Sequence, residues 1–222
     1  MIYAIGDIHG RFDLLLKMKA LIMTDMEKYD GPHKVITLGD YIDRGPDSRR
    51  VVQMLMKDHP FGEDVEFIPL YGNHEDLMLA AMKNREGEEA DIWLSNGGIQ
   101  TCDSYNYWME DKFPGDHIAW MKSLKLFHEE PGYLFVHAGI DPLRPDERDP
   151  ARLLWIRKPF LESTIDYGFV VVHGHSKNPL PQLKNNRIGI DTGAYKTGIL
   201  TCAAIDATDD VRFLQVKPGV LS

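Results

Sequence analysis

Short apolar runs and longer amphipathic segments alternate along the first part of the chain. The apolar runs have the length and composition of buried strands and lie at residues 2–5, 34–38 and 65–70. The amphipathic segments that follow them predict helices at about 11–29, 46–58 and 74–84. Asp7, Asp40 and Asn73 follow the three strands at equal intervals, each as long as a strand, a helix and two loops. This spacing predicts two successive βαβ units, and therefore parallel strands.

The strand pattern stops between about residues 86 and 130. Three helical pieces are predicted there, at 88–94, 99–110 and 115–126, and we expect them to form a small helical cap beside the sheet edge. The cap carries four large aromatic side chains, Tyr105, Tyr107, Trp108 and Trp120. We expect these rings to form the core of the cap, and contact with substrate is the alternative.

Strand patterns return in the last part of the chain, at residues 132–136, 169–172, 187–190, 198–205 and 211–216. We expect the last three strands to be antiparallel, with a short loop at 194–198. The proline-rich segment 141–160 is predicted to be irregular. The whole pattern predicts an α/β (α+β) fold in which two mixed sheets pack face to face. Helices flank the sheets, and the ligand-binding edge lies between them.

Length, charge and cysteine content limit the functional classes. A chain of 222 residues and 25.3 kDa suits a single domain over residues 1–222. The formal net charge of −9 argues against a surface for nucleic acid or anionic membranes. The chain has no long apolar stretch and no basic leader, so we expect a cytoplasmic protein, and we expect a monomer. Cys102 and Cys202 have no close cysteine partner, so we expect two reduced thiols.

Polar turns follow five of the predicted strands. They are Gly6-Asp7-Ile8-His9-Gly10, Gly39-Asp40-Tyr41-Ile42-Asp43-Arg44-Gly45, Gly72-Asn73-His74-Glu75, His137-Ala138-Gly139 and His173-Gly174-His175-Ser176. Ligands of open α/β sheets bind at the carboxyl ends of the strands, which is where these turns lie. A lone histidine or aspartate after a strand is usually structural, but five such turns along one sheet edge predict a binding site.

The side chains of these turns offer nitrogen and oxygen donors without a thiolate, which suits Mn²⁺, Fe or Zn²⁺. The six candidate ligands are Asp7, His9, Asp40, Asn73, His137 and His175. Six ligands are too many for one ion with an open position, so we expect two divalent metal ions. Two ions that share a bridging carboxylate form the clamp used in phosphoryl transfer, and their surplus positive charge attracts phosphate or a bridging hydroxide.

Four further side chains complete the predicted site. Arg44 and Arg157 can each contact phosphate oxygens through paired guanidinium hydrogen bonds. His74 lies at a helix start, directly after a candidate metal ligand, and is well placed to protonate a leaving oxygen. Asp43 can fix the tautomer of this histidine and raise its basicity.

The turns at 6–10, 39–45 and 72–75 resemble the three signature blocks of the PPP phosphoprotein phosphatases. The two later turns resemble the metal-histidine blocks of that family, and the short chain is similar to its bacterial and phage subgroup. The resemblance implies a metallophosphoesterase β-sandwich with flanking helices. It also implies roles for the ligands. The first ion would be held by Asp7 and His9, the bridge would be Asp40, and the second ion would be held by Asn73, His137 and His175.

The resemblance further implies that His74 and Asp43 form a general-acid pair and that Arg44 and Arg157 hold phosphate. The segment around Arg157 matches the family over only a few residues, and Arg152 is the alternative. These four roles complete the residue assignments that the family pattern provides.

Two histidines compete for the last ligand position, His173 and His175. The family pattern places the ligand after the glycine, so His175 is expected to bind metal and His173 to support the site or to be structural. Broader metallophosphoesterases often carry Gly-His-x-His here, whereas Lys177 follows Ser176 in this chain. This departure favours the PPP branch.

The resemblance implies a protein phosphatase that hydrolyses phosphoserine and phosphothreonine monoesters by direct attack of a bridging metal-bound hydroxide. Phosphorylated proteins would be its substrates, and manganese is the ion that we expect. The alternative enzyme is a symmetrical dinucleoside tetraphosphate (diadenosine tetraphosphate) hydrolase, which has similar blocks but more typically an aspartate where this chain has Glu75. A third alternative is an inactive scaffold of the same fold, which the complete set of expected ligands argues against.

Overall fold

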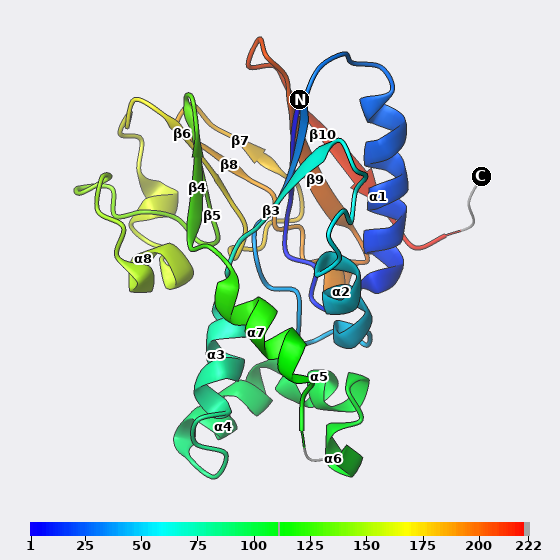
Figure 1. Ribbon diagram of the computed structural model, residues 1–222. Helices are drawn as coiled ribbons and strands as arrows, with labels where there is room; N and C mark the ends of the chain where they lie inside the picture. The colour runs from blue at the N-terminus through cyan, green and yellow to red at the C-terminus, as the bar shows by residue number, and fades with distance from the viewer. Residues whose placement is uncertain (111, 220–222) are drawn as a thin grey trace.

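The computed structural model describes residues 1–110 and 112–219, and its strands form two five-stranded sheets (Figure 1). The first sheet has the order β10-β9-β1-β2-β3. Its strands are β1 (Ile2–Ile5), β2 (His33–Thr37), β3 (Val65–Pro69), β9 (Leu200–Ile205) and β10 (Val211–Val216). Strands β1, β2 and β3 are parallel, which confirms the two predicted βαβ units. Strand β9 runs antiparallel to β1, and β10 runs antiparallel to β9.

The second sheet has the order β4-β5-β6-β8-β7. Its strands are β4 (Phe127–Glu130), β5 (Tyr133–Val136), β6 (Val170–His173), β7 (Gln182–Leu183) and β8 (Arg187–Gly189). The three central strands are parallel, and an antiparallel strand closes each edge. Both sheets are therefore mixed, as the sequence predicts.

Alternating side chains place each sheet between two apolar layers. In β1, Tyr3 and Ile5 face the outer core of the first sheet, whereas Ala4 faces the core between the sheets. In β5, Phe135 joins the same central core, and Leu134 faces the outside of the second sheet. Because successive side chains of a strand point to opposite faces, this pattern packs the two sheets face to face. The predicted sandwich is confirmed.

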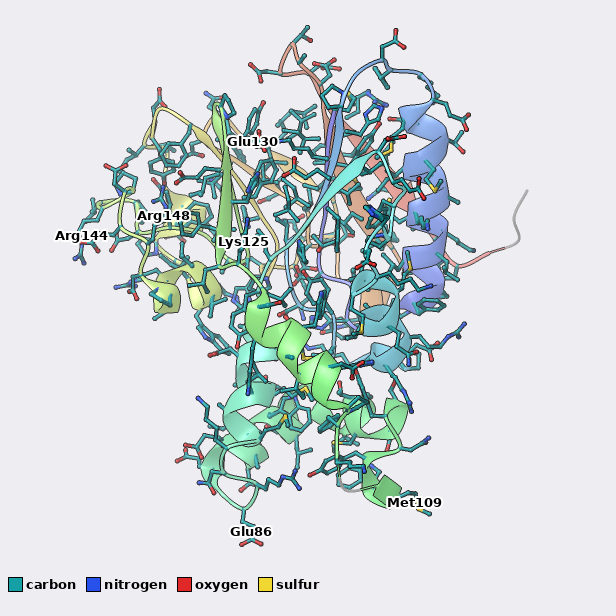
Figure 2. All side chains as sticks on the ribbon, viewed as in Figure 1. Glu86, Met109, Lys125, Glu130, Arg144 and Arg148 are labelled. Carbon is teal, nitrogen blue, oxygen red and sulfur yellow. The ribbon has the colours of Figure 1, made fainter. Side chains whose placement is uncertain are left out.

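Helices cover the outer faces and one end of the sandwich (Figure 1). Helices α1 (Phe12–Met26) and α2 (Ser48–Leu55) pack on the first sheet, and α8 (Pro150–Trp155) with the 3₁₀ turn η2 (Phe160–Glu162) packs on the second. The remaining helical pieces are α3 (Asn73–Ala81), α4 (Glu88–Trp93), the π-helical turn η1 (Leu94–Gly98), α5 (Ile99–Ser104), α6 (Tyr107–Glu110), α7 (Gly115–Ser123) and α9 (Ala194–Thr197). Helices α3 to α7 gather below the sheets, with Glu86 and Met109 at their far tip (Figure 2).

The predicted helical segment 86–130 is wrong at its end, because residues 127–130 form the edge strand β4. This strand pairs with β5 in the register Phe127 to Val136. Only Phe127 contributes an apolar side chain to the neighbouring core, and His128, Glu129 and Glu130 complete the strand. Edge strands commonly carry charged residues that discourage pairing with other chains, which hides the alternating pattern.

The predicted antiparallel set of three strands is also wrong in one member. Strand β8 belongs to the second sheet, and only β9 and β10 pair with each other. Residues 194–197 form the short helix α9 rather than a hairpin loop, so the chain crosses from one sheet to the other there. The segment 141–160 is more regular than expected, because the Asp149 carboxylate caps α8 and Pro150 is its first residue.

Two aromatic side chains of the helical cap differ in their exposure to solvent. Tyr105 is buried in the helical core, as expected, whereas Trp108 is 58% exposed. Cys102 and Cys202 are both buried and free, which confirms the prediction of free thiols. Within residues 1–110 and 112–219, no helix combines the length and the apolar character needed to cross a bilayer.

One carboxylate joins the loop after β2 to the loop after β3. The Oε1 atom of Glu75 accepts hydrogen bonds from the backbone N–H groups of Tyr41 (2.9 Å) and Ile42 (3.4 Å). Its Oε2 atom accepts from the N–H groups of Asp40 (2.9 Å) and Gly72 (3.1 Å). Glu75 has no exposed surface, so these four donors replace water completely. This clamp fixes the two polar loops relative to each other.

We therefore expect Glu75→Gln to lower the free energy of unfolding by about 1–3 kcal/mol, because the new amide group turns its own N–H bonds toward buried backbone N–H groups. Urea denaturation measures the loss. Asp76→Asn is the matched control, since within residues 1–110 and 112–219 the half-buried Asp76 carboxylate accepts a single long hydrogen bond, from Tyr71 (3.3 Å). This control is expected to change stability by no more than about 0.5 kcal/mol. Equal losses in the two variants would contradict a clamp at Glu75.

Candidate metal centre and active site

The carboxyl ends of five strands bring the six predicted ligands to one place between the sheets. The loops after β1, β2 and β3 supply Asp7, His9, Asp40 and Asn73, and the loops after β5 and β6 supply His137 and His175. All six side chains are buried, and the most exposed residue, His175, is only 6% exposed. Both sheets are therefore needed to assemble the site.

The backbone of these loops is strained. Seven non-glycine residues of the described chain have a positive φ angle, and five of them lie at the site: His9, Asp40, Asp43, Arg44 and His175. Such angles cost roughly 1–3 kcal/mol each and persist only where surrounding contacts enforce them. Glycines allow the loops to touch, since a Cβ atom on Gly45 would lie 2.0 Å from the carbonyl oxygen of His9.

Asp40 lies at the centre of the cluster. Its Oδ2 atom is 3.4 Å from His9 Nε2 and 3.9 Å from His74 Nε2, and its Oδ1 atom is 3.5 Å from His137 Nε2. Among the described residues, two groups of side chains could each hold a metal ion, Asp40 with His9 and His74, and Asp40 with Asp7 and His137. Burial alone would raise the pKa of Asp40, but the nearby rings of His137, His74 and His9 outweigh burial and lower it. Asp40 is the one member that both groups share.

One ring nitrogen from each of two histidines lies close to the same oxygen atom. The Nδ1 atom of His137 donates to the carbonyl of Leu38 (2.7 Å), and its Nε2 atom lies 2.8 Å from the Oδ1 atom of Asn73. The Nδ1 atom of His175 lies 2.9 Å from the same oxygen. Burial lowers the pKa of His175 to about 2, so this ring is neutral. Imidazole nitrogens beside amide and carboxylate oxygens suit a divalent cation, so these residues fit the implied metal.

His9 is oriented in the same way. Its Nδ1 atom donates to the carbonyl of Ile42 (2.8 Å), so Nε2 faces Asp40 without a proton. Burial lowers the pKa of His9 well below its usual value. The side chain is therefore held as a neutral donor, with its ligand atom turned into the site.

Asp191 also belongs to the site, although the sequence analysis missed it. It is buried and hydrogen-bonds to the side chain of Asp7. Burial raises the pKa of Asp7, and the charges of Asp191 and Asp40 raise it further. The backbone N–H of His175 donates to both oxygens of Asp7 (3.1 Å each). The five recognised turns share a pattern in which an apolar strand is followed by a polar turn. The same pattern occurs at Ile188-Gly189-Ile190-Asp191-Thr192-Gly193, and it could have identified Asp191.

His74 and Asp43 form a close pair, with 2.6 Å between His74 Nδ1 and Asp43 Oδ2. Burial alone would lower the pKa of His74, but the charges of Asp40 and Asp43 outweigh it, so the pKa is raised. Two residues that the sequence analysis did not assign to the site also contact the pair. The indole nitrogen of Trp93 donates to both oxygens of Asp43 (3.1 and 3.0 Å), and the hydroxyl of Thr101 donates to Oδ1 (2.7 Å).

The two predicted arginines have different surroundings. The Nη1 atom of Arg44 lies 2.6 Å from His9 Nε2, and its guanidinium group lies 5.0 Å from the ring centre of Tyr195. Arg157 is exposed, and its charge contributes to the lowered pKa of His175, so it borders the second half of the site. The alternative residue, Arg152, is exposed on α8.

The structure separates the two competing histidines. His175 faces Asn73, whereas the ring of His173 packs against Phe160, with 5.1 Å between ring centroids. Phe160 belongs to the outer core of the second sheet. The Nδ1 atom of His173 donates to the carbonyl of Gly174 (3.0 Å), and burial lowers its pKa to about 4. His173 therefore lies away from the cluster.

Comparison with known proteins agrees with this geometry. The chain is 28% identical over 219 residues to serine/threonine-protein phosphatase 2 of Escherichia coli, with 90% of each protein covered. It is 28% identical over 151 residues to the symmetrical bis(5'-nucleosyl)-tetraphosphatase of Methylococcus capsulatus, which covers 68% of this chain and 47% of that protein.

Comparison of folds gives a similar result. A crystal structure provisionally named a diadenosine tetraphosphatase superposes with a TM-score of 0.71 at 20% identity, covering 98% of this chain and 94% of the other. Residues 1–202 match the sequence model of the calcineurin-like phosphoesterases. Since that match includes all six candidate ligands and most of the chain, this protein belongs to the calcineurin-like phosphoesterase family.

Proposed function

We propose that this phosphoesterase is a protein phosphatase that hydrolyses phosphoserine and phosphothreonine monoesters. The observation that carries the proposal is the buried pair of His74 and Asp43 beside Asp40, because an alkyl phosphate needs an acid to protonate its leaving oxygen. The Escherichia coli relative supports the same reading, since it matches 90% of both chains and is named a serine/threonine-protein phosphatase.

Calcineurin-like phosphoesterases use divalent metal ions, and we assign the ligands as two sets that share Asp40. The resemblance to the PPP family assigns Asp7 and His9 to the first set, and Asn73, His137 and His175 to the second, in which both histidine rings lie within hydrogen-bond distance of Asn73. Asp40 is also the member shared by the two groups that the geometry brings together, one with His9 and His74 and one with Asp7 and His137. When bound, the two ions activate a water molecule and neutralise charge on the phosphoryl group. Nitrogen and oxygen donors suit manganese, which is the ion that we propose, with iron or zinc as alternatives.

The protein side chains supply the remaining steps. Arg44 and Arg157 hold two phosphoryl oxygens and orient the ester bond. As the water oxygen bonds to phosphorus, the water releases one proton to solvent. The bond from phosphorus to the serine oxygen breaks, and that oxygen takes the proton from Nε2 of His74. Asp43 accepts the hydrogen bond from Nδ1 and stabilises the positive charge of the imidazolium before the transfer.

The second candidate is a symmetrical dinucleoside tetraphosphatase, favoured by the Methylococcus capsulatus relative. Paired assays of the manganese-loaded protein on a phosphoserine peptide and on diadenosine tetraphosphate separate the two activities. We expect kcat/KM to be at least about tenfold higher for the peptide, because the site would be shaped for a monoester. A higher kcat/KM for diadenosine tetraphosphate than for the peptide would support the tetraphosphatase. Full metal content with turnover of neither substrate would indicate the inactive scaffold.

We expect His175→Ala to lose one of two bound metal ions, because the variant removes a donor that faces Asn73. His173→Ala is the matched control, and it is expected to keep both ions because its ring packs against Phe160 instead. Elemental analysis of the purified variants gives the number of ions per chain. Loss of metal from His173→Ala alone would move the ligand assignment to His173.

We expect His74→Asn to lower kcat on a phosphoserine peptide by about 10²–10⁴-fold, because the asparagine cannot deliver a proton to the alkoxide. The fall on p-nitrophenyl phosphate is expected to be much smaller, since p-nitrophenolate leaves without a proton. Asp43→Asn should also lose more kcat on the phosphoserine peptide than on p-nitrophenyl phosphate, but both losses should be smaller than in His74→Asn. Equal losses on both esters, with both metals retained, would show that His74 serves binding rather than proton transfer.

A further inference from the structure

We infer that residues 93–101 of the helical region, here called the bracing segment, orient both Asp43 and Arg44 for catalysis. Trp93 and Thr101 are positioning residues for Asp43, and Gly97 positions Arg44. The segment includes the end of α4, the π-helical turn η1 and the start of α5. The inference extends the role proposed above for His74 and rests on it.

Hydrogen bonds from three elements hold the Asp43 carboxylate. Its Oδ2 atom faces His74 at 2.6 Å, its Oδ1 atom accepts from Thr101 at 2.7 Å, and the Trp93 N–H bridges both oxygens. Trp93 is 5% exposed and Thr101 is fully buried, so water does not replace these donors. A carboxylate fixed at both oxygens cannot rotate away from His74 Nδ1, and this keeps the imidazole in one tautomer.

The Thr101 hydroxyl forms hydrogen bonds with the backbone of Asp43 as well as with its carboxylate. It accepts a hydrogen bond from the N–H of Asp43 (2.8 Å) and lies 3.1 Å from the hydroxyl of Ser48. Asp43 has a φ angle of 69°, a conformation that needs such support in a residue other than glycine. One hydroxyl from α5 thus stabilises both the strained backbone and the carboxylate orientation.

The π-helical turn makes the corresponding contact with Arg44. The carbonyl of Gly97 accepts a hydrogen bond from the N–H of Arg44 (3.1 Å), whose φ angle is 68°. Gly97 itself has a φ angle of 111°, and a Cβ atom there would lie 2.7 Å from Cγ of Arg44. Only glycine fits this close approach without strain. The non-helical conformation of Gly97 places a kink between α4 and α5, and at this kink the Gly97 carbonyl faces Arg44.

A positioning role and a packing role predict different kinetics. If Trp93 and Thr101 only stabilised the fold, their loss would affect all substrates alike. If they orient the acid pair, their loss weakens proton delivery, so an ester with a poor leaving group suffers most. A tryptophan in the neighbouring helix α6 offers the comparison, because Trp108 donates to the Asp103 carboxylate (2.7 Å) at an exposed position.

The test compares Trp93→Phe and Thr101→Val with the controls Trp108→Phe and Thr101→Ser. Each variant is loaded with manganese and assayed on a phosphoserine peptide and on p-nitrophenyl phosphate. We expect the first two to lose about tenfold more kcat on the peptide than on the aryl ester, as a partial loss of acid catalysis requires. We expect both controls to keep the wild-type ratio, because Thr101→Ser retains the hydroxyl and Trp108 does not contact Asp43.

A second readout does not depend on turnover. In protein labelled with ¹⁵N-histidine and studied at a pH high enough to neutralise the His74 ring, the chemical shifts of its two ring nitrogens show which one keeps its proton. We expect a fixed Nδ1–H form in the wild-type protein and both controls, and averaged shifts in Trp93→Phe and Thr101→Val. Because Thr101→Val removes a single hydroxyl, it tests the inference even if Trp93→Phe fails to fold.

The two readouts separate the inference from the proposed function. A wild-type protein that does not hydrolyse the phosphoserine peptide would refute the proposed function, and the nitrogen shifts would still test the positioning of His74. Unchanged shifts and an unchanged ratio of kcat losses in Thr101→Val would overturn the inference, whatever the substrate of the enzyme. Altered shifts in both variants, with unaltered controls, would support it.

Discussion

The buried carboxylate of Glu75 is the constraint on which the site depends. Four backbone N–H groups from two loops converge on it, so those loops cannot move independently without leaving donors unpaired in a dry interior. The clamp places Asp40 at the centre of the site and starts α3 directly beside it, with Asn73 and His74 in its first turn. The positions of these candidate site residues therefore depend on hydrogen bonds between Glu75 and the backbone.

The same principle explains how strained residues are tolerated. His9, Asp40, Asp43, Arg44 and His175 all adopt left-handed backbone conformations, and hydrogen bonds to their neighbours offset that cost. The N–H of His175 binds Asp7, that of Asp43 binds Thr101, and that of Arg44 binds Gly97. Strain and hydrogen bonding together leave each side chain few alternative orientations, which is what a site with fixed donors requires.

Local sequence patterns predicted the strand-end turns because apolar runs, glycines and polar ligands lie within a few residues of one another. Sheet membership could not be predicted in the same way. Strand β8 looks like a partner of β9, yet long-range packing places it beside β6. The contact between Trp93 and Asp43 joins residues 50 positions apart, and nothing in an amphipathic helix marks one tryptophan as a donor to a distant loop. Asp191 was predictable, since it follows an apolar run and lies two residues before a glycine.

The division of the candidate ligands between the two sheets would link metal binding to folding. A chain whose second sheet has not yet packed against the first presents Asp7, His9, Asp40 and Asn73 without His137 and His175. Ions that bind only the complete donor set would favour the closed sandwich by mass action. The concentration of available metal would then influence how completely the two sheets pack together. An incompletely folded chain would not hydrolyse phosphate esters.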